Sequence, residues 1–154
     1  MTRLSEGDRA PAFTLSDQNG QKVALKDFAG HRVVLYFYPA DDTPGCTKEA
    51  CQFNDEFAAF RKLDVALIGV SPDGPDTHLA FRSKYGLQFI LLSDPDKTVM
   101  ARYGAFGEKM MYGKKVTGVI RSTFVIGPTG EIERAFYNVR ADGHAAKVLS
   151  GLSN

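Results

Sequence analysis

The chain has 154 residues, which suits one domain whose core is large enough to need no disulfide or metal support. Its 19 basic and 18 acidic residues are interspersed and leave a formal charge of +1, so the composition argues against a nucleic-acid groove or a membrane-binding face. Residues 1–7 lack the apolar core of a signal peptide, and no apolar run approaches transmembrane length. We therefore expect a cytoplasmic protein that forms one domain over residues 1–154.

Apolar segments of strand and helix type alternate along the first hundred residues. Asn19-Gly20 lies between two short strand-like segments and is a strong signal for a hairpin turn. Val33 begins an uninterrupted apolar run that is typical of a strand buried on both faces. This part of the chain predicts strands at residues 12–15, 22–25, 33–38, 65–70 and 89–92, and helices at residues 46–62, 76–85 and 95–103. Because strands and helices alternate, part of the sheet should be parallel.

The last third of the chain predicts antiparallel pairing instead. Residues 105–118 are rich in Gly and Lys and show no clear period, so we predict a loop or a weak hairpin there. A turn at residues 127–130 joins strands at residues 122–126 and 131–137 as an antiparallel pair. A helix at residues 143–152 closes the chain. These elements predict an α/β fold with a mixed sheet, although a doubly wound fold shares much of the same pattern.

The junction between the strand at residues 33–38 and the helix that follows it carries most of the chemical information. Its sequence from residue 38 to residue 51 is YPADDTPGCTKEAC. Thr43 followed by Pro44 suits a helix N-cap and the first helical position, which puts Cys46 in the first turn of the helix. Free backbone N–H groups and the helix dipole favour a reactive thiolate there. The alternative is that Cys46 is a small buried apolar residue.

The second cysteine, Cys51, lies five residues after Cys46. On a regular helix this separation is a rise of about 7.5 Å with a rotation of about 140°, and the two sulfurs point away from each other. A disulfide between them therefore requires the start of the helix to unwind. The spacing matches neither a thioredoxin-type redox motif nor a structural zinc pair. We expect no metal and no cofactor, because His31, His78 and His144 are far apart and match no metal-ligand spacing.

Two long motifs resemble one protein family. Residues 36–51 (YFYPADDTPGCTKEAC) are similar to the active site of the peroxiredoxins, specifically the bacterioferritin comigratory protein branch. Residues 118–126 (GVIRSTFVI) resemble the same branch, and so do residues 106–109 and 111–114 between the two motifs. The likeness covers nearly the whole chain. It implies a thioredoxin-like fold with a central mixed sheet flanked by helices and an added N-terminal β-hairpin.

The resemblance also implies roles for individual residues in the reduction of a hydroperoxide. Cys46 would attack the terminal peroxide oxygen and become a sulfenic acid, while Thr43 and Arg121 contact the thiolate and the peroxide. Pro39 would shield the sulfur from solvent. Cys51 would then form an intramolecular disulfide with Cys46, which thioredoxin, glutaredoxin or a similar thiol reduces. The resemblance further implies a monomer, since both cysteines belong to one chain. From the charge and composition we expect no nucleic-acid or membrane partner.

Each of these assignments has a structural alternative. Thr43 suits a helix N-cap, Pro39 suits the end of a strand, and a lone Arg121 before a strand is usually solvated. Cys51 also suits the apolar helix face beside Phe53. Two other functions share the same residues: a general thiol-disulfide oxidoreductase, and a redox sensor that oxidises once and then binds a partner.

Overall fold

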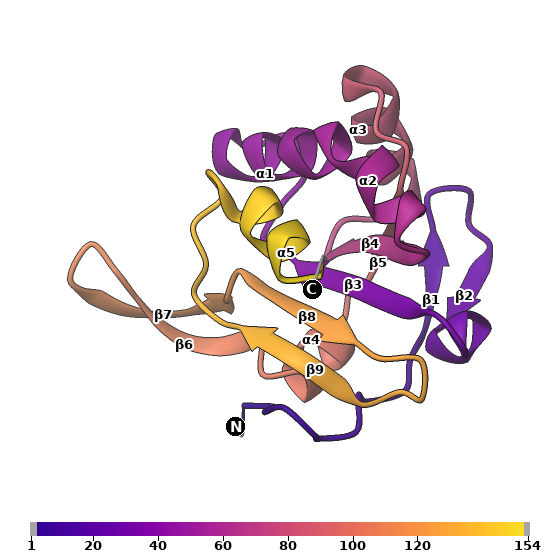
Figure 1. Cartoon of the computed structure of the whole chain (residues 1–154). Coiled ribbons are helices and arrows are strands. Elements are labelled where there is room, and N and C mark those ends of the chain that lie inside the picture. The colour runs from indigo at the N-terminus through magenta and orange to yellow at the C-terminus, as the bar shows by residue number, and fades with distance from the viewer. Residues whose placement is uncertain (1–2, 153–154) are drawn as a thin grey trace.

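The computed structural model describes residues 3–152 and has a mixed sheet at its centre (Figure 1). The sheet consists of β1 Thr14–Asp17, β2 Lys22–Ala24, β3 Arg32–Phe37, β4 Val65–Ser71, β5 Ile90–Ser93, β8 Ser122–Ile126 and β9 Ile132–Phe136. The strand order is β2-β1-β5-β4-β3-β8-β9. Strand β4 is parallel to both β3 and β5, and every other pairing in this sheet is antiparallel. The predicted mixed sheet is confirmed.

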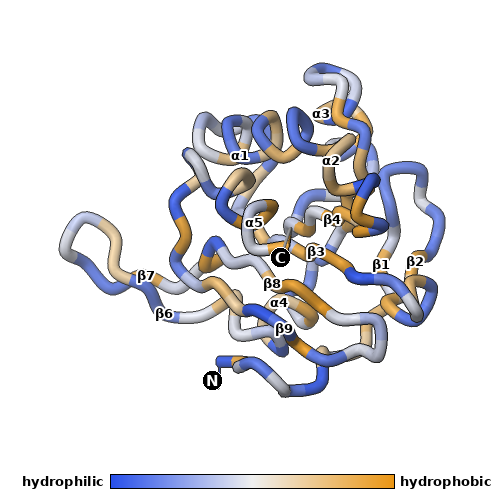
Figure 2. The backbone as a smooth tube through the Cα atoms, in the orientation of Figure 1, coloured by the Kyte–Doolittle hydropathy of each residue, from blue (hydrophilic) through white to orange (hydrophobic). Residues whose placement is uncertain are grey.

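Helices cover both faces of this sheet (Figure 1). One face carries α1 Pro44–Asp55, α2 Phe57–Lys62, α3 Pro75–Tyr85 and α5 His144–Leu152, and the other carries α4 Thr98–Arg102. The apolar run of β3 supplies both layers, since Val34 and Tyr36 pack under α1 and α2 while Val33 and Leu35 pack towards α4. Figure 2 shows that the hydrophobic stretches of β3 and β8 lie at the centre of the molecule. The prediction that this strand is buried on both faces is confirmed.

The N-terminal hairpin is also confirmed, with its first strand two residues later than we predicted. The carboxylate of Asp17 accepts hydrogen bonds from the backbone N–H groups of Asn19 and Gln21, both at 2.9 Å. This buried carboxylate organises the turn, so β1 extends up to residue 17. Strand β1 then pairs with β5, which adds the hairpin to one edge of the main sheet.

The prediction of one continuous helix over residues 46–62 is wrong at its start and in its continuity, although its last residue, Lys62, agrees with the structure. The helix begins at Pro44, and it is interrupted at Glu56, whose φ of −95° and ψ of 1° leave the helical range. The N–H of Glu56 is shared between the carbonyl oxygens of Gln52 and Phe53, at 3.3 and 3.1 Å. This tightened turn ends α1 and starts α2 in a new direction.

The structure determines the length of the helix predicted at residues 95–103 and the form of the loop or weak hairpin predicted at residues 105–118. The helix at residues 95–103 is shorter than predicted, because the Asp94 carboxylate binds the N–H groups of Val99 and Met100 and holds the preceding residues in a turn. Residues 105–118 form a hairpin of β6 Phe106–Met111 and β7 Lys114–Val119, which projects from the body of the molecule (Figure 1). Tyr112 and Gly113 both have positive φ, as tight hairpin turns require.

Residues 3–152 lack two features that define other classes of protein. None of the helices there has the length and apolar character needed to cross a membrane. In the same residues, His, Cys, Asp and Glu side chains form no group of three or more that could hold a metal ion.

Candidate active site

The sheet brings the two long motifs of the sequence, residues 36–51 and 118–126, to one place. Strands β3 and β8 are antiparallel neighbours, and their register pairs Phe37 with Ser122. Arg121, the residue before β8, therefore lies beside the end of β3, where the chain turns into α1. Residues that are 75 positions apart in the sequence meet here because the two strands are adjacent.

Cys46 lies at the centre of this site and is only 2% exposed. The Nη2 of Arg121 donates a hydrogen bond to Cys46 Sγ at 3.3 Å, and the Nη1 of the same guanidinium lies 2.5 Å from Glu49 Oε1. Glu49 follows Cys46 by three residues, so both side chains lie on the same face of α1. One guanidinium thus bridges a sulfur and a carboxylate, and a cation at this distance stabilises an anionic sulfur.

Burial and ion pairing act in opposite directions on the pKa values of Glu49 and Arg121. The side chain of Glu49 is fully buried, and this burial raises its pKa from 4.5 to about 7 although Arg121 acts in the opposite direction. Burial lowers the pKa of Arg121, but Glu49 and Cys46 together raise it above its usual value. Within the described residues, Glu49 Oε2 and Tyr36 Oη have no hydrogen-bond partner. The site therefore holds a fixed cation, a carboxyl that titrates near neutrality and two unpaired polar atoms.

Thr43 and Pro39 lie in the loop between β3 and α1. Thr43 occupies the N-cap position of α1, but its side chain makes no capping hydrogen bond, and its Oγ1 donates to the carbonyl oxygen of Ala40 at 3.0 Å instead. The expected alternative, that Thr43 serves as a hydrogen-bonding cap, is therefore wrong. Pro39 is half-buried and directly follows Tyr38, whose N–H still bonds to Val70 in β4.

Cys51 lies outside this cluster, in the second half of α1. Both cysteines are free thiols, and Cys51 is partly exposed. Burial raises the pKa of the Cys51 thiol, and the nearby charge of Asp55 raises it further. The next residue, Gln52, ties α1 to the segment before α5: its Nε2 donates to Asp142 Oδ1 at 2.7 Å and its Oε1 accepts from the N–H of Gly143 at 2.8 Å.

Our sequence analysis missed Glu49, Tyr36 and the buried pair of Asp41 and His78. The spacing of Glu49 to Cys46 could have identified it, because residues three apart share a helix face. Tyr36 alternates with Phe37 along β3, which indicates the face but not the unpaired hydroxyl. No sequence signal joins Asp41 to His78, which lie 37 residues apart and meet only in the folded protein.

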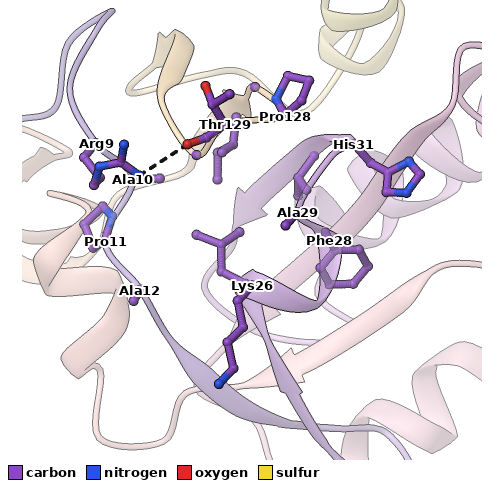
Figure 3. Close-up of a pocket in the computed structure, with 15 residues that line it drawn as sticks. Arg9, Ala10, Pro11, Ala12, Lys26, Phe28, Ala29, His31, Pro128 and Thr129 are labelled. Atoms are coloured by element: carbon purple, nitrogen blue, oxygen red, sulfur yellow. Dashed lines mark hydrogen bonds between the residues drawn. The ribbon is translucent and has the colours of Figure 1, made fainter.

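A separate cavity of about 740 Å³ lies at the other end of β3 and β8, near Val33 and Ile126. Its floor is mostly apolar, and three basic side chains, Arg9, Lys26 and His31, lie around it. Figure 3 shows that these three side chains point in different directions and do not converge on one point. Since Cys46 and Arg121 lie at the opposite ends of the same strands, this cavity is not part of the thiol site.

The chain is similar in sequence to known proteins. Residues 6–135 match the AhpC/TSA family. The chain is 42% identical over 152 residues to peroxiredoxin Bcp of Escherichia coli K12, an alignment that covers 99% of this chain and 97% of that protein. With the same coverage, it is 55% identical over 152 residues to a Mycobacterium tuberculosis protein whose name places it among the peroxiredoxins.

Solved structures agree with the sequence relatives. The bacterioferritin comigratory protein of Xanthomonas campestris, studied for its alkyl peroxide reduction activity, is 40% identical with a TM-score of 0.86, covering 92% of this chain and 90% of that one. A cysteine mutant of PrxQ from Xylella fastidiosa is 35% identical with a TM-score of 0.92, covering 99% and 98%. The predicted thioredoxin-like fold is thereby confirmed. The chain belongs to the AhpC/TSA family and is a peroxiredoxin, a thiol-dependent peroxidase, of the bacterioferritin comigratory protein type.

Proposed function

We propose that this peroxiredoxin reduces hydrogen peroxide and organic hydroperoxides with Cys46 as the attacking thiol and Cys51 as the resolving thiol. The observation that carries this assignment is the hydrogen bond from Arg121 to Cys46 Sγ, at 3.3 Å in a buried site. For Cys51, burial and the charge of Asp55 both raise the pKa. Cys46 is therefore the thiol whose surroundings suit nucleophilic attack.

The first step is the attack of the Cys46 thiolate on the terminal oxygen of the peroxide. An S–O bond forms while the O–O bond breaks, so the sulfur is oxidised to a sulfenic acid and the leaving oxygen takes a proton to become an alcohol or water. Negative charge moves from the sulfur to the leaving oxygen. Arg121 faces the sulfur with a fixed positive charge, and we assign it the stabilisation of this moving charge.

Thr43 and Pro39 complete the proposed peroxide site. The Thr43 hydroxyl already donates to Ala40, so its oxygen keeps its lone pairs free to accept the proton of a hydroperoxide. Pro39 begins the loop that covers the start of α1, where it would limit the access of water to Cys46. Glu49 binds the other terminal nitrogen of the Arg121 guanidinium, so it acts as a positioning residue for Arg121.

In the second step the Cys51 sulfur attacks the Cys46 sulfenic acid. An S–S bond forms, and the hydroxyl group leaves with a proton as water. Because the two residues are about 7.5 Å apart along a helix axis and face different directions, the first turns of α1 must unwind for this step. Unwinding also exposes the disulfide, which suits reduction by a protein dithiol that is itself oxidised to a disulfide.

We assign residues 1–154 to one catalytic domain that works as a monomer, because one chain supplies both thiols. Thioredoxin or glutaredoxin would be the reductant, and the cytoplasm, where thiols are kept reduced, would be the location.

Intact mass spectrometry of the reduced protein after one equivalent of peroxide tests the assignment. We expect an internal disulfide in the wild type, a sulfenic acid or its trapped adduct in Cys51→Ser, and no modification in Cys46→Ser. If Cys46→Ser reacts as readily as the wild type, Cys46 is not the attacking thiol. Hydrogen exchange then tests the unwinding step, since equal protection of residues 46–53 in the reduced and disulfide forms contradicts it.

A further inference from the structure

A buried polar pair joins Asp41, in the loop before α1, to His78 of α3 and takes no part in the steps at Cys46. Asp41 Oδ2 lies 2.6 Å from His78 Nδ1, and Asp41 Oδ1 accepts a hydrogen bond from Tyr38 Oη at 2.5 Å. His78 Nε2 lies 2.9 Å from the carbonyl oxygen of Leu92. The side chains of His78 and Asp41 are 0% and 1% exposed. Both carboxylate oxygens and both ring nitrogens therefore have partners.

The partners determine where the hydrogens of this pair lie. The carbonyl oxygen of Leu92 can only accept, so His78 Nε2 carries a hydrogen. The short contact between His78 Nδ1 and Asp41 also requires a hydrogen between the two atoms. A second hydrogen thus joins the imidazole to the carboxylate in a buried site. Removing either partner leaves a buried polar group unpaired, which destabilises its surroundings far more than losing an exposed ion pair.

This pair attaches the active-site loop to the rest of the protein. Asp41 comes five residues before Cys46, whereas His78 belongs to α3 and Leu92 to β5. The N–H of Asp41 also donates to Asp73 Oδ2 at 2.8 Å. The loop is therefore fixed at Asp41 through both its side chain and its backbone.

A weaker attachment to α3 follows at the next residue. The carboxylate of Asp42 contacts Lys84 Nζ at 2.7 Å and Tyr85 Oη at 2.6 Å, and both contacts are exposed. Exposed ion pairs of this kind contribute little to stability, so we regard Asp41 as the main attachment on this side.

The other end of the helical segment has its own attachment, at Gln52. Its side-chain amide binds Asp142 and the N–H of Gly143, as described above. Residues 42–51 therefore lie between two side-chain anchors, and both Cys46 and Cys51 belong to this segment. The anchor before the segment is buried, and the one after it is exposed.

We propose that the Asp41–His78 pair sets how readily residues 42–51 unwind once Cys46 is oxidised, and so governs the choice between disulfide formation and over-oxidation. This inference rests on the proposed pairing of Cys46 with Cys51. While the anchor holds, the sulfenic acid stays in the folded site, where a second peroxide oxidises it to a sulfinic acid and is itself reduced to an alcohol or water. When the segment unwinds, Cys51 reaches the sulfenic acid first. Asp41 and His78 are positioning residues for this step.

His78→Phe tests the inference, because it keeps an aromatic ring of similar shape and removes both polar contacts. The readout is the peroxide concentration at which half of Cys46 becomes sulfinic acid per turnover. For each variant this concentration is normalised to the rate of peroxide attack of the same variant, and this normalised value is the ratio compared below. We expect this concentration to rise about tenfold, in line with the loss of a hydrogen bond to a charged group. A purely structural role would reduce stability without moving this ratio.

Two further variants serve as comparisons. Asp41→Asn keeps the shape and can still bond to both Tyr38 and His78, so we expect it to retain most of the wild-type behaviour and shift the ratio in the same direction by a smaller factor. Lys84→Met removes the exposed attachment from the same helix, and we expect a shift of less than about twofold. If His78→Phe does not fold, the direction of the Asp41→Asn shift decides the question.

Hydrogen exchange of the reduced protein separates this inference from the proposed function. Without peroxide, residues 42–51 should exchange faster in His78→Phe than in the wild type, whatever Cys51 does chemically. Equal exchange together with an unchanged ratio would overturn the inference. If the wild type forms no internal disulfide, the pairing of Cys46 with Cys51 fails, but faster exchange in the variant still identifies Asp41–His78 as the anchor of this segment.

Discussion

Cys46 and Cys51 lie on the same helix, but the sheet contributes a partner to only one of them. Cys46 faces the start of β8, where Arg121 donates to its sulfur and Glu49 holds the other side of the guanidinium. Cys51 is partly exposed, and both burial and Asp55 raise its pKa. The helix start favours a thiolate at Cys46, in the first turn of α1, over one at Cys51, in its second half. The cation brought by the neighbouring strand adds to this difference, and each prediction below changes one part of the contrast.

Removing the cation should have the largest effect. We expect Arg121→Met to lower the second-order rate constant for peroxide by about 10²–10³-fold, the usual loss when a donor to a developing charge is removed. Stopped-flow measurement of the first turnover gives this value. Arg140→Met is a matched control, since Arg140 is exposed, and it should stay within about twofold of the wild type. A loss below about threefold in Arg121→Met would show that the guanidinium is not what separates the two cysteines.

Removing the buried carboxyl should change how stability depends on pH. The folded pKa of Glu49 is raised from 4.5 to about 7, so the folded protein binds a proton that the unfolded chain has released between these values. The stability from this group is therefore fully present below pH 4.5 and is lost as the pH rises to 7, a change on the order of 3 kcal/mol. Chemical denaturation of the reduced protein between pH 4.5 and 8 measures it.

Glu49→Gln is the variant for that experiment, because glutamine keeps the shape and does not titrate. Over the same pH range its free energy of unfolding should fall less than that of the wild type. If the free energy of unfolding changes equally with pH in the two proteins, Glu49 is already ionised in the folded state at low pH. Lys48→Glu provides a comparison on the exposed part of the same helix, where a carboxyl should titrate close to its usual range.

The smallest effect concerns the reactivity of Cys51. In a Cys46→Ser background, the raised pKa of Cys51 leaves less thiolate at pH 8 in the folded protein than in the unfolded chain. Iodoacetamide should therefore alkylate Cys51 more slowly in buffer than in urea. Adding Asp55→Asn should increase the rate in buffer, since Asp55 contributes to the raised pKa. Faster alkylation in buffer than in urea would contradict the contrast between the two thiols.

Local features of the chain were predictable because they depend on residues close in sequence. The apolar run from Val33 indicated a strand buried on both faces, Asn19-Gly20 indicated the hairpin, and Pro44 indicated the helix start near Cys46. Sequence motifs also identified the family. The strand, the hairpin and the helix start each depend on side-chain periodicity or backbone preference within a few residues. The unfolded chain already has both properties.

Helix boundaries were less predictable, since contacts between nearby backbone and side-chain groups compete there. The interruption at Glu56 follows from a shared backbone hydrogen bond, and the late start of α4 follows from the Asp94 carboxylate binding two N–H groups. Apolar periodicity continues through both places and does not record these bonds. The same limit applies to Thr43, whose hydroxyl bonds to Ala40 rather than capping α1.

The sequence by itself determined the strand and helix pattern, the family and the two thiols on one helix. Only the tertiary structure decided which groups surround Cys46. Arg121 reaches the sulfur because β8 lies beside β3, and Asp41 meets His78 because α3 packs near the end of the same sheet. Strand order and helix packing bring together residues far apart in the chain. Burial of Glu49 beside them then shifts its pKa, which depends on surroundings that no local pattern encodes.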